Sequence, residues 1–371
     1  MKKVLAVTGI FPPDIGGPAT YVPRFCNYLT SHNLNVEVIT LSESRDVQDS
    51  KYPFRILRIE RNRKRWFRML RTLATIMKQM KNVDFVFCNG LYFETALALR
   101  LSLIKVPSLV KIVGDPVWER AQNRVVTRNP IQARVERGLL YMLGRLERKA
   151  ITWSLLQFDR VTTPGESLAQ EVESWSTSLK VQVVNNGVKI PNEEIDEEKK
   201  YDLVTISRLV PWKNVDIVIA IAAQLGCTLA IIGDGPQRQF LESSALSNPN
   251  VTFFGQQNYE QIENILRRSR VFCQLSDYEG LSFSLLQAMA YSLPCVLSDI
   301  KANRDVFQSD HQVGLFVASR NIHECSKVIK ELLNSPKMQK ELGKRSHSIA
   351  KSKFDEIKQM ETMMKLLINH D

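Results

Sequence analysis

The chain has 371 residues, of which 44% are hydrophobic and 24% are charged, and its net charge is +11. This length predicts two or three domains that bury a full core without disulfides or metal. The composition therefore excludes a disulfide-stapled scaffold and a disordered protein. The first 189 residues carry 29 basic and 16 acidic side chains, whereas the remainder carries 21 and 23, so we expect two domains with different roles.

The six cysteines lie far apart in the sequence, and no two have CxxC spacing. No histidine cluster completes a zinc set, so we predict no metal site and no cofactor. Scattered cysteines are typical of buried thiols in a reducing compartment, which favours a cytoplasmic location. The apolar N-terminal run ends at Pro12 and Pro13 and indicates a buried strand rather than a signal peptide. The uncharged stretch 217–233 contains Gln224 and Gly226 and is not predicted to span a membrane.

Short β-branched runs alternate with longer helical patterns along the whole chain. Nearly continuous apolar strands separated by helices are typical of parallel sheets covered on both faces. The expected strands are 4–9, 36–41, 54–59, 85–89, 108–113, 160–164 and 181–186, followed by 201–207, 228–233, 251–255, 271–276, 294–298 and 314–317. Each series is long enough for one Rossmann-like, doubly wound α/β domain.

The loop after the first expected strand contains two adjacent glycines, Gly16 and Gly17, before a helix that is expected to start near Pro18. Backbone N–H groups at such a helix start suit anionic oxygens. The alternative is a plain strand-to-helix turn. The loop is not a GxGxxG fingerprint and none occurs elsewhere, which counts against a nicotinamide-dependent dehydrogenase.

Residues 51–81 contain eleven basic side chains and one acidic side chain, Glu60. Helical spacing places an apolar stripe, Trp66, Leu70, Leu73, Met77 and Met80, opposite the basic positions Lys64, Arg68, Arg71 and Lys78. Such a helix suits an anionic bilayer surface, and the stretch 133–150 is also basic and helical. The predicted membrane contacts are Arg61, Arg63, Lys64, Arg65, Trp66, Phe67, Arg68 and Arg71. Alternatively, the stripe packs on the sheet and the basic face is solvated.

A proline and a dense acidic run interrupt the apolar pattern near residues 189–200 and predict a linker. We expect an N-terminal domain of residues 1–192 and a C-terminal domain of residues 193–353, which face a central cleft where ligands of α/β sheets bind. Residues 354–371 are expected to form a helix that packs back on the first domain. Its expected apolar stripe is Phe354, Ile357, Met360, Met364 and Leu367.

Three loops of the second half carry residues suited to a phosphorylated ligand. Arg208 and Lys213 follow the strand 201–207 as cations that could hold a diphosphate, or are simply solvated. The next strand ends in a GDGP turn. Glu279 and Gly280 lie between a strand and a helix, where the N–H groups of Leu281, Ser282 and Phe283 are at the positive helix end. Gln287 follows two helical turns later and could equally be an ordinary helix residue.

These motifs, in this order across successive strands, resemble family-4 retaining glycosyltransferases of the GT-B fold. The resemblance covers nearly the whole chain, because the glycine loop FPPDIGGPATYV and the segment NNGVKIP are also similar to segments of that family. It implies that Arg208 and Lys213 stabilise the diphosphate in place of a metal ion. It also implies that Glu279 contacts the transferred sugar while Gly280, Leu281 and Ser282 donate N–H groups.

The sequence departs from the family pattern at two positions. The carboxylate that usually holds the ribose hydroxyls is replaced by Gln287, which should weaken donor binding by roughly 1–2 kcal/mol. Many relatives carry a histidine where this chain has Gly114 and Asp115. We expect Asp115 to bind a sugar hydroxyl or orient the acceptor, with an aspartate that merely opens a turn as the alternative.

The resemblance implies transfer of a sugar, with retention, from a UDP- or GDP-sugar to a lipid-linked or saccharide acceptor in polysaccharide or glycolipid assembly. We expect a peripheral enzyme at the inner face of the cell membrane. A nucleotide-sugar epimerase of related fold is the main alternative. A nucleic-acid-binding protein is disfavoured, because no recognised module is present and the second-half motifs would go unexplained.

Overall fold

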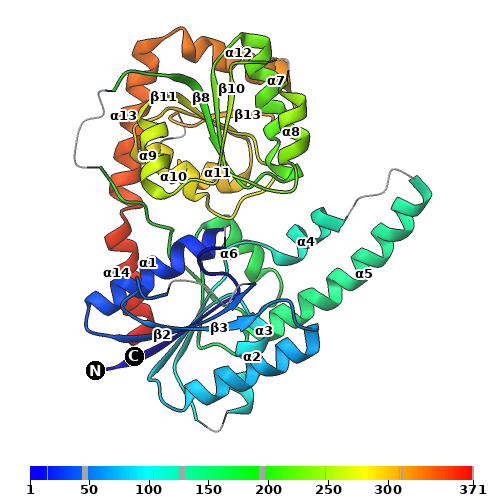
Figure 1. The fold of residues 1–371 in the computed structure, drawn as a ribbon, viewed down its shortest axis with the longest axis vertical. Helices are drawn as coiled ribbons and strands as arrows, with labels where there is room; N and C mark the ends of the chain where they lie inside the picture. Colours follow the sequence, from blue (N-terminus) through cyan, green and yellow to red (C-terminus); the bar gives the residue numbers. More distant parts are fainter. Residues whose placement is uncertain are drawn as a thin grey trace. The chain divides into compact units, whose positions relative to one another are not determined.

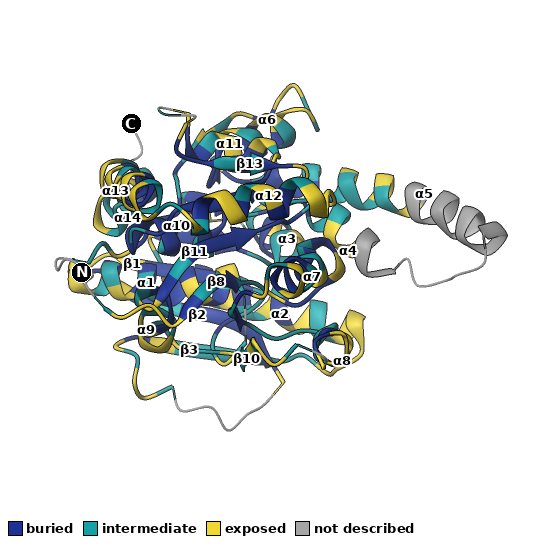
Figure 2. Ribbon diagram, turned by 90° about the horizontal axis from the view of Figure 1, so that it is seen from above, coloured by how far each residue is buried: buried dark blue, intermediate teal, exposed yellow. Residues whose placement is uncertain are grey.

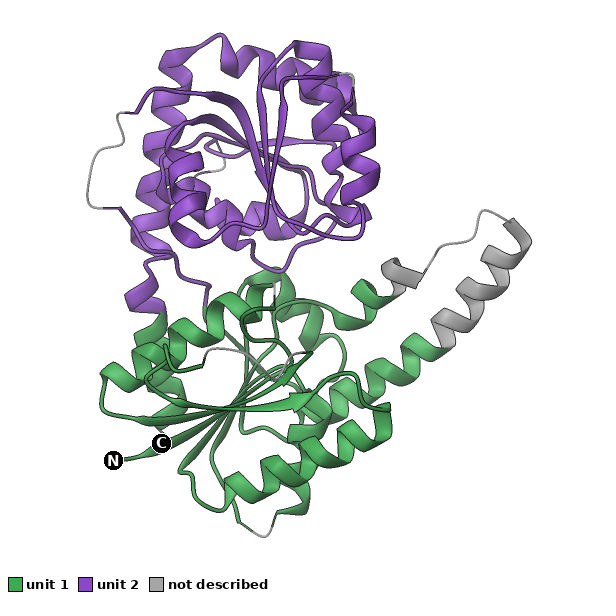
Figure 3. Cartoon of the chain, viewed as in Figure 1, with its two compact units in different colours: residues 1–184, 360–371 green, residues 185–359 purple. Residues whose placement is uncertain are grey.

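The computed structural model describes residues 1–14, 16–43, 49–102, 104–124, 130–191, 197–246, 248–308, 310 and 312–369, with the backbone alone for residues 121–124 and 130–142. Contacts divide the chain into two units (Figure 3). Unit 1 comprises residues 1–184 and 360–371, and unit 2 comprises residues 185–359. Part of the expected linker, residues 192–196, lies outside the described residues.

Unit 1 is built on the sheet that contains β2 and β3 in Figure 1. This sheet is parallel and seven-stranded, in the order β3-β2-β1-β4-β5-β6-β7. Its strands are β1 (Lys3–Thr8), β2 (Asn35–Ser42), β3 (Arg55–Glu60), β4 (Phe85–Asn89), β5 (Ser108–Lys111), β6 (Arg160–Thr163) and β7 (Val181–Val183). Its helices are α1 (Gly17–Ser31), α2 (Arg65–Met80), α3 (Tyr92–Leu101), α4 (Pro116–Arg124), α5 (Pro130–Leu155) and α6 (Glu166–Glu173). The strand order reverses between β1 and β4, which makes this the switch point of the sheet.

Helices cover both faces of the unit 1 sheet, because its central strands are apolar on both sides. Cys88 of β4 and Val110 of β5 pack with Leu155 of α5 in one buried cluster. On the other face, Phe87 of β4 meets Phe25 of α1 with ring centroids 4.9 Å apart. The sheet is therefore a buried middle layer, as the continuous apolar strands predict.

Unit 2 contains a parallel six-stranded sheet in the order β10-β9-β8-β11-β12-β13, with its switch point between β8 and β11. The strands are β8 (Tyr201–Ile206), β9 (Leu229–Ile232), β10 (Val251–Gly255), β11 (Ser269–Gln274), β12 (Cys295–Ser298) and β13 (Leu315–Val317). The helical segments are the 3₁₀ turn η1 (Pro211–Lys213), α7 (Val215–Leu225), α8 (Arg238–Ser244), α9 (Tyr259–Arg267), α10 (Phe283–Ala290), α11 (Lys301–Val306), α12 (Ile322–Leu333) and α13 (Pro336–Lys353).

The unit 2 sheet is also covered on both faces, and its strands are largely buried (Figure 2). Leu203 of β8 belongs to a cluster with Val218 of α7. Its neighbour Val204 points to the other face and joins Leu286 of α10. The predicted α/β class with two doubly wound sheets is confirmed. Each of the thirteen expected strands is found within a few residues of its expected bounds.

The uncharged stretch 217–233 forms the end of a helix and a strand. Helix α7 ends at Leu225, Gly226 adopts the left-handed conformation with φ +66°, and β9 begins at Leu229. No helix in the described ranges combines the length and apolar character needed to cross a membrane.

Helix α14 (Glu356–Ile368) runs from unit 2 into unit 1. Within it the buried side chains are Met360, Met363 and Leu367. The expected stripe is therefore wrong at two positions. Met363 is buried where Met364 was expected to be, and Ile357 is 59% exposed. Phe354 is buried, but it caps the end of α13. In unit 1, Arg160 of β6 donates from Nη1 to the Leu366 carbonyl at 2.6 Å.

Helix α2 buries a face that coincides only in part with the stripe that the sequence predicts. Its buried positions are Thr72, Ile76 and Met80. Residues 66 and 70 lie about 120° and 160° from residue 72 around the helix axis, because successive residues turn by about 100°. Trp66, Phe67 and Leu70 are therefore 54%, 51% and 49% exposed, and only the second half of the expected stripe packs on unit 1.

Candidate active site

The loops that follow β8 and β11 lie at the switch point of the unit 2 sheet, where α/β proteins bind ligands. They bring together two predicted site residues that are 66 positions apart. Lys213 Nζ donates to Glu279 Oε1 at 2.6 Å. The side chains are 17% and 10% exposed. The lysine and the carboxylate therefore neutralise one another in a partly buried pair.

These two loops are held together by residues that sequence analysis missed. Asn214 Nδ2 donates to the Leu275 carbonyl at 2.8 Å and to Asp277 Oδ1 at 2.7 Å. The Asp277 N–H in turn donates to the Trp212 carbonyl at 2.8 Å. Asn214 has φ +50°, a left-handed conformation that asparagine tolerates better than most residues. This asparagine therefore fixes Lys213 relative to the loop that carries Glu279.

Arg208, in the same loop as Lys213, is exposed. Within the described residues its guanidinium makes no hydrogen bond or ion pair. It therefore remains available for an anion, whereas Lys213 is already paired. The structure brings both cations to the carboxyl end of β8, as the sequence predicts for a strand-to-helix loop.

The GDGP turn packs closely against the backbone of the loop that carries Arg208. A Cβ atom on Gly233 would lie 1.9 Å from the Ser207 carbonyl oxygen, and one on Gly235 would lie 2.4 Å from the Leu209 carbonyl oxygen. Only glycine permits two backbone segments to approach so closely. The Asp234 carboxylate accepts from the Gly235 N–H at 2.7 Å, and this bond, followed by that from Arg238, lowers its pKa.

Helix α10 begins at Phe283, three residues after Gly280. Ser282 is its N-cap and accepts from the Leu285 N–H at 3.2 Å. In the part of the chain that the structure describes, the N–H groups of Gly280, Leu281 and Ser282 donate to no other backbone group. Gln287, later in α10, is half-buried, and its amide has no hydrogen-bond partner among the described side chains. These N–H groups and this amide keep hydrogen-bonding capacity that a ligand could use.

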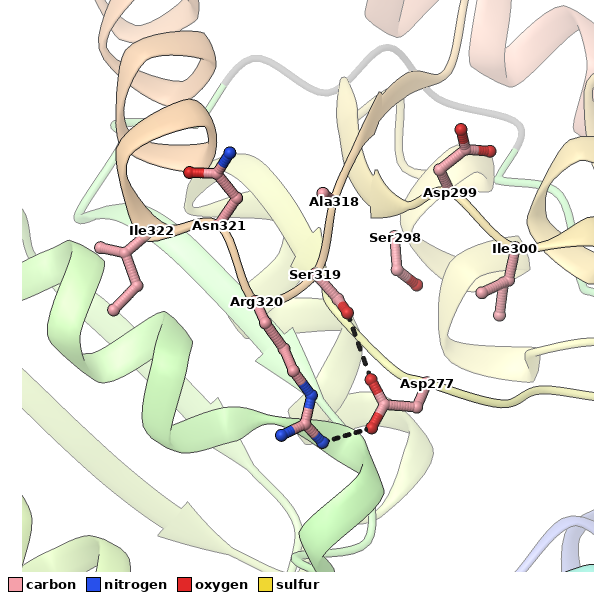
Figure 4. Close-up of a pocket in the computed structure, with 9 residues that line it drawn as sticks. All are labelled: Asp277, Ser298, Asp299, Ile300, Ala318, Ser319, Arg320, Asn321 and Ile322. Carbon is pink, nitrogen blue, oxygen red and sulfur yellow. Dashed lines mark hydrogen bonds and ion pairs between the residues drawn. The ribbon is translucent and has the colours of Figure 1, made fainter.

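A cavity of about 850 Å³ opens at the carboxyl ends of β11, β12 and β13. It is lined by Asp277, Ser298, Asp299, Ile300, Ala318, Ser319, Arg320, Asn321 and Ile322. Figure 4 shows the Asp277 carboxylate between Ser319 Oγ at 3.2 Å and Arg320 Nη2 at 2.7 Å. Because Asp277 also accepts from Asn214, this cavity adjoins the loops of the Lys213–Glu279 pair.

In unit 1, the glycine loop leads from β1 into α1. Gly16 is the N-cap of α1 with φ +146°, and a Cβ atom there would meet the Ile10 side chain at 2.8 Å. Gly17 is the exposed first residue of the helix. Arg61 donates to Asp14 Oδ2 at 2.5 Å and to the Gly9 carbonyl at 3.2 Å. The Arg61 guanidinium therefore binds this loop, and its role as a membrane contact stays a prediction.

Asp115 is 2% exposed, and both of its carboxylate oxygens are occupied. Oδ1 accepts from the Val117 and Trp118 N–H groups at 2.9 and 3.2 Å, which caps α4. Oδ2 accepts from Arg148 at 2.5 Å. Burial, followed by the Asp115 charge, raises the pKa of Glu171 to about 7. This arrangement favours the alternative in which Asp115 opens a turn, and leaves it no free oxygen for a substrate.

The remaining predicted membrane contacts lie at the start of α2. Arg63, Lys64, Arg65 and Arg71 are exposed together with Trp66 and Phe67, whose ring centroids are 3.9 Å apart. Arg68 is instead half-buried and donates to the Arg61 carbonyl at 2.8 Å. In the second basic stretch, the side chains of residues 133–142 lie outside the described residues.

No group of three or more His, Cys, Asp or Glu side chains is placed to hold a metal ion in the described ranges. The six cysteines are buried free thiols.

Comparison with known proteins identifies the family. Residues 15–190 match the model of the family described as Glycosyltransferase Family 4, and residues 189–348 match the model described as Glycosyl transferases group 1. The two models together match both halves of the chain, which therefore belongs to the family-4, group 1 glycosyltransferases.

Among curated relatives, a poly(ribitol-phosphate) alpha-N-acetylglucosaminyltransferase of Staphylococcus aureus is 27% identical over 172 residues, which are 44% of this chain and 34% of that protein. The chain spans about a quarter to a half of the length of the first curated relatives it matches.

Solved structures of similar fold include the sucrose-phosphate synthase of Thermosynechococcus elongatus, with TM-score 0.80, 17% identity and coverage of 99% and 98% of the two chains. The Anabaena protein HepE in complex with UDP and glucose has TM-score 0.78, 13% identity and coverage of 98% and 99%. These likenesses show that the fold is GT-B.

Proposed function

We propose that the protein is a retaining, metal-independent glycosyltransferase. It transfers a sugar from a UDP- or GDP-sugar to a lipid-linked or saccharide acceptor in polysaccharide or glycolipid assembly. The observation that carries this proposal is the Lys213–Glu279 pair at the unit 2 switch point, next to the exposed Arg208. Membership of the family supports the proposal.

The donor diphosphate would bind between the loops after β8 and β11. Arg208 offers a guanidinium fork and Lys213 a mobile point charge, a combination suited to phosphate oxygens. Lys213 leaves Glu279 when it turns to the diphosphate, and the N–H groups of Gly280 to Ser282 add donors at the start of α10. Two protein cations thereby stabilise the leaving group, which is the task that a metal ion performs in other enzymes.

Glu279 contacts the transferred sugar. Of its two carboxylate oxygens, Oε1 accepts from Lys213, and Oε2 has no partner within the described residues. Oε2 can therefore accept from a sugar hydroxyl. In the transfer step, the bond from the acceptor oxygen to the anomeric carbon forms as the bond to the phosphate oxygen breaks. The departing phosphate takes the acceptor proton on the same face, which retains configuration.

We propose that unit 1 holds the acceptor and meets an anionic membrane surface at the inner face of the cell membrane. Arg63, Lys64, Arg65 and Arg71 would attract the lipid headgroups, and Trp66 and Phe67 would enter the interface. Arg61 and Arg68 are excluded from this set because their side chains hold unit 1 backbone.

The proposed function is tested by assaying a panel of UDP- and GDP-sugars with a lipid-linked acceptor in the presence of EDTA. We expect transfer from one donor, and a product whose anomeric configuration by NMR matches that of the donor. Inversion, or loss of activity with EDTA that Mg²⁺ restores, would contradict the mechanism. An isomerised nucleotide sugar without transfer would support the epimerase alternative.

A further inference from the structure

Gln274 is an unexpected residue at the end of an apolar strand. It is the last residue of β11, follows the fully buried Phe272 and Cys273, and is itself only 4% exposed. Burying an amide costs free energy unless hydrogen bonds compensate for the lost water. Gln274 lies five positions before Glu279, and the Glu279 carboxylate provides the compensating bond.

Gln274 Nε2 donates to Glu279 Oε1, the same oxygen that receives Lys213 Nζ. A second, longer contact joins Nε2 to Ser276 Oγ at 3.5 Å. Gln274 Oε1 is buried without a partner in the described residues. The negative charge of Glu279 decides this orientation, because the flipped amide would place its carbonyl oxygen against the carboxylate.

Lys213 cannot hold Glu279 throughout the reaction. The proposed function assigns Lys213 to the diphosphate, whose negative charge competes with Glu279 for the ammonium group. When Lys213 turns to the phosphate, Gln274 is the remaining donor to Oε1 among the described contacts. The Gln274 amide is uncharged and fixed at the end of a strand, so the diphosphate does not draw it away from Glu279. It can therefore hold the Glu279 carboxylate before and after donor binding.

We propose that Gln274 is a positioning residue that keeps Glu279 oriented during transfer while Lys213 serves the diphosphate. The inference rests on the proposed function. It assigns Oε1 of Glu279 to Gln274 and leaves Oε2 for the sugar. Gln274 therefore acts through Glu279 on the sugar, and its loss should lower kcat more than it changes the donor KM.

Two substitutions test this role. Gln274→Met keeps the shape of the side chain but removes the donor, and should lower kcat roughly 10- to 100-fold with the donor KM within about twofold of wild type. Gln274→Glu places a second carboxylate against Glu279, and two adjacent carboxylates do not both ionise readily. Its activity should therefore increase as the pH falls from 8 to 5.5, when a shared proton restores the hydrogen bond, in contrast to wild type and Gln274→Met.

Gln224→Met is the matched control, because it makes the same change in α7, where Gln224 accepts from Ser326. All variants are compared by thermal midpoint and by calorimetric binding of the donor. If wild type transfers sugar and Gln274→Met keeps its kcat, or if Gln274→Glu shows no gain on acidification, the positioning role is wrong. If wild type neither binds nor transfers any nucleotide sugar, the proposed function itself fails.

Discussion

At the scale of single residues, Lys111 of unit 1 is a lysine inside the core. It is fully buried at the end of β5. Its Nζ lies 3.4 Å from the Val184 carbonyl and 4.0 Å from the centroid of the Tyr21 ring. Burial lowers its pKa to about 7, whereas an unfolded chain gives lysine a pKa near 10.4. The folded state therefore releases this proton more readily than the unfolded state.

This pKa difference predicts a pH-dependent effect of Lys111→Met. As the pH falls from about 10 to 7, Lys111 binds its proton in the unfolded chain but not yet in the folded one, so the free energy of unfolding decreases. Below pH 7 both states are protonated, and this loss of stability is complete. The variant should be more stable than wild type by roughly 2–4 kcal/mol at pH 6, with a gain that shrinks above pH 7. Thermal midpoints between pH 6 and 10 measure this, and a constant difference would show that charge burial is not responsible.

Gln287 provides a second prediction for a single residue. Its amide has no hydrogen-bond partner in the described part of α10, and the sequence resemblance places it where a carboxylate is expected to hold the ribose. Gln287→Glu should lower the donor KM roughly 5- to 30-fold, because a charge-assisted bond replaces a neutral one. Initial-rate kinetics measure the change, with Gln224→Glu as a control for the added charge. An unchanged donor KM would remove Gln287 from the ribose contact.

At the scale of elements, the GDGP turn joins the β9–α8 connection to the Arg208 loop. Gly235→Ala places a Cβ atom 2.4 Å from the Leu209 carbonyl oxygen, so one backbone segment must move. We expect a loss of roughly 1–3 kcal/mol in stability and a raised donor KM, because Arg208 moves with its loop. Gly226→Ala is the control, since it has left-handed strain but nothing within 4 Å. Equal donor KM values in the two variants would argue against a supporting role.

The start of α2 is the element that should meet lipid. Trp66→Ser combined with Phe67→Ser should reduce binding to anionic vesicles severalfold, because these exposed rings can enter the interface. The basic residues beside them predict weaker binding at high salt. Co-sedimentation measures both effects, with Ile357→Ser as a control for loss of another exposed apolar side chain. Unaltered vesicle binding would exclude this part of α2 as the contact.

At the scale of the whole molecule, α14 returns the chain to unit 1. Truncation after Gln359 removes Met360, Met363 and Leu367, each of which stabilises unit 1 by about 1.5–3 kcal/mol when fully buried. Hydrogen exchange should therefore become faster in unit 1, including α1 and β6, while unit 2 keeps its protection. Exchange measured by mass spectrometry tests this, and full protection of α1 in the truncated chain would contradict it.

Local patterns were sufficient for the architecture. Continuous apolar runs predicted all thirteen strands, because a strand that is covered on both faces must be apolar at nearly every position. The strand positions also indicated the loops that carry Arg208, Lys213 and Glu279, since the loops that follow parallel strands lie at one edge of the sheet. Periodicity failed for the first half of the α2 stripe, because the face that a helix buries depends on which neighbours cover it.

The sequence by itself thus determined two doubly wound α/β units, the family and the loops that carry Arg208, Lys213 and Glu279. Only the tertiary structure decided how individual side chains are used. It paired Lys213 with Glu279, occupied Asp115 with Arg148 and the α4 backbone, and set Gln274 against Glu279. The physical reason is that strand and helix patterns arise from neighbouring residues, whereas the partner of a buried charge is chosen by chain segments that meet only after folding.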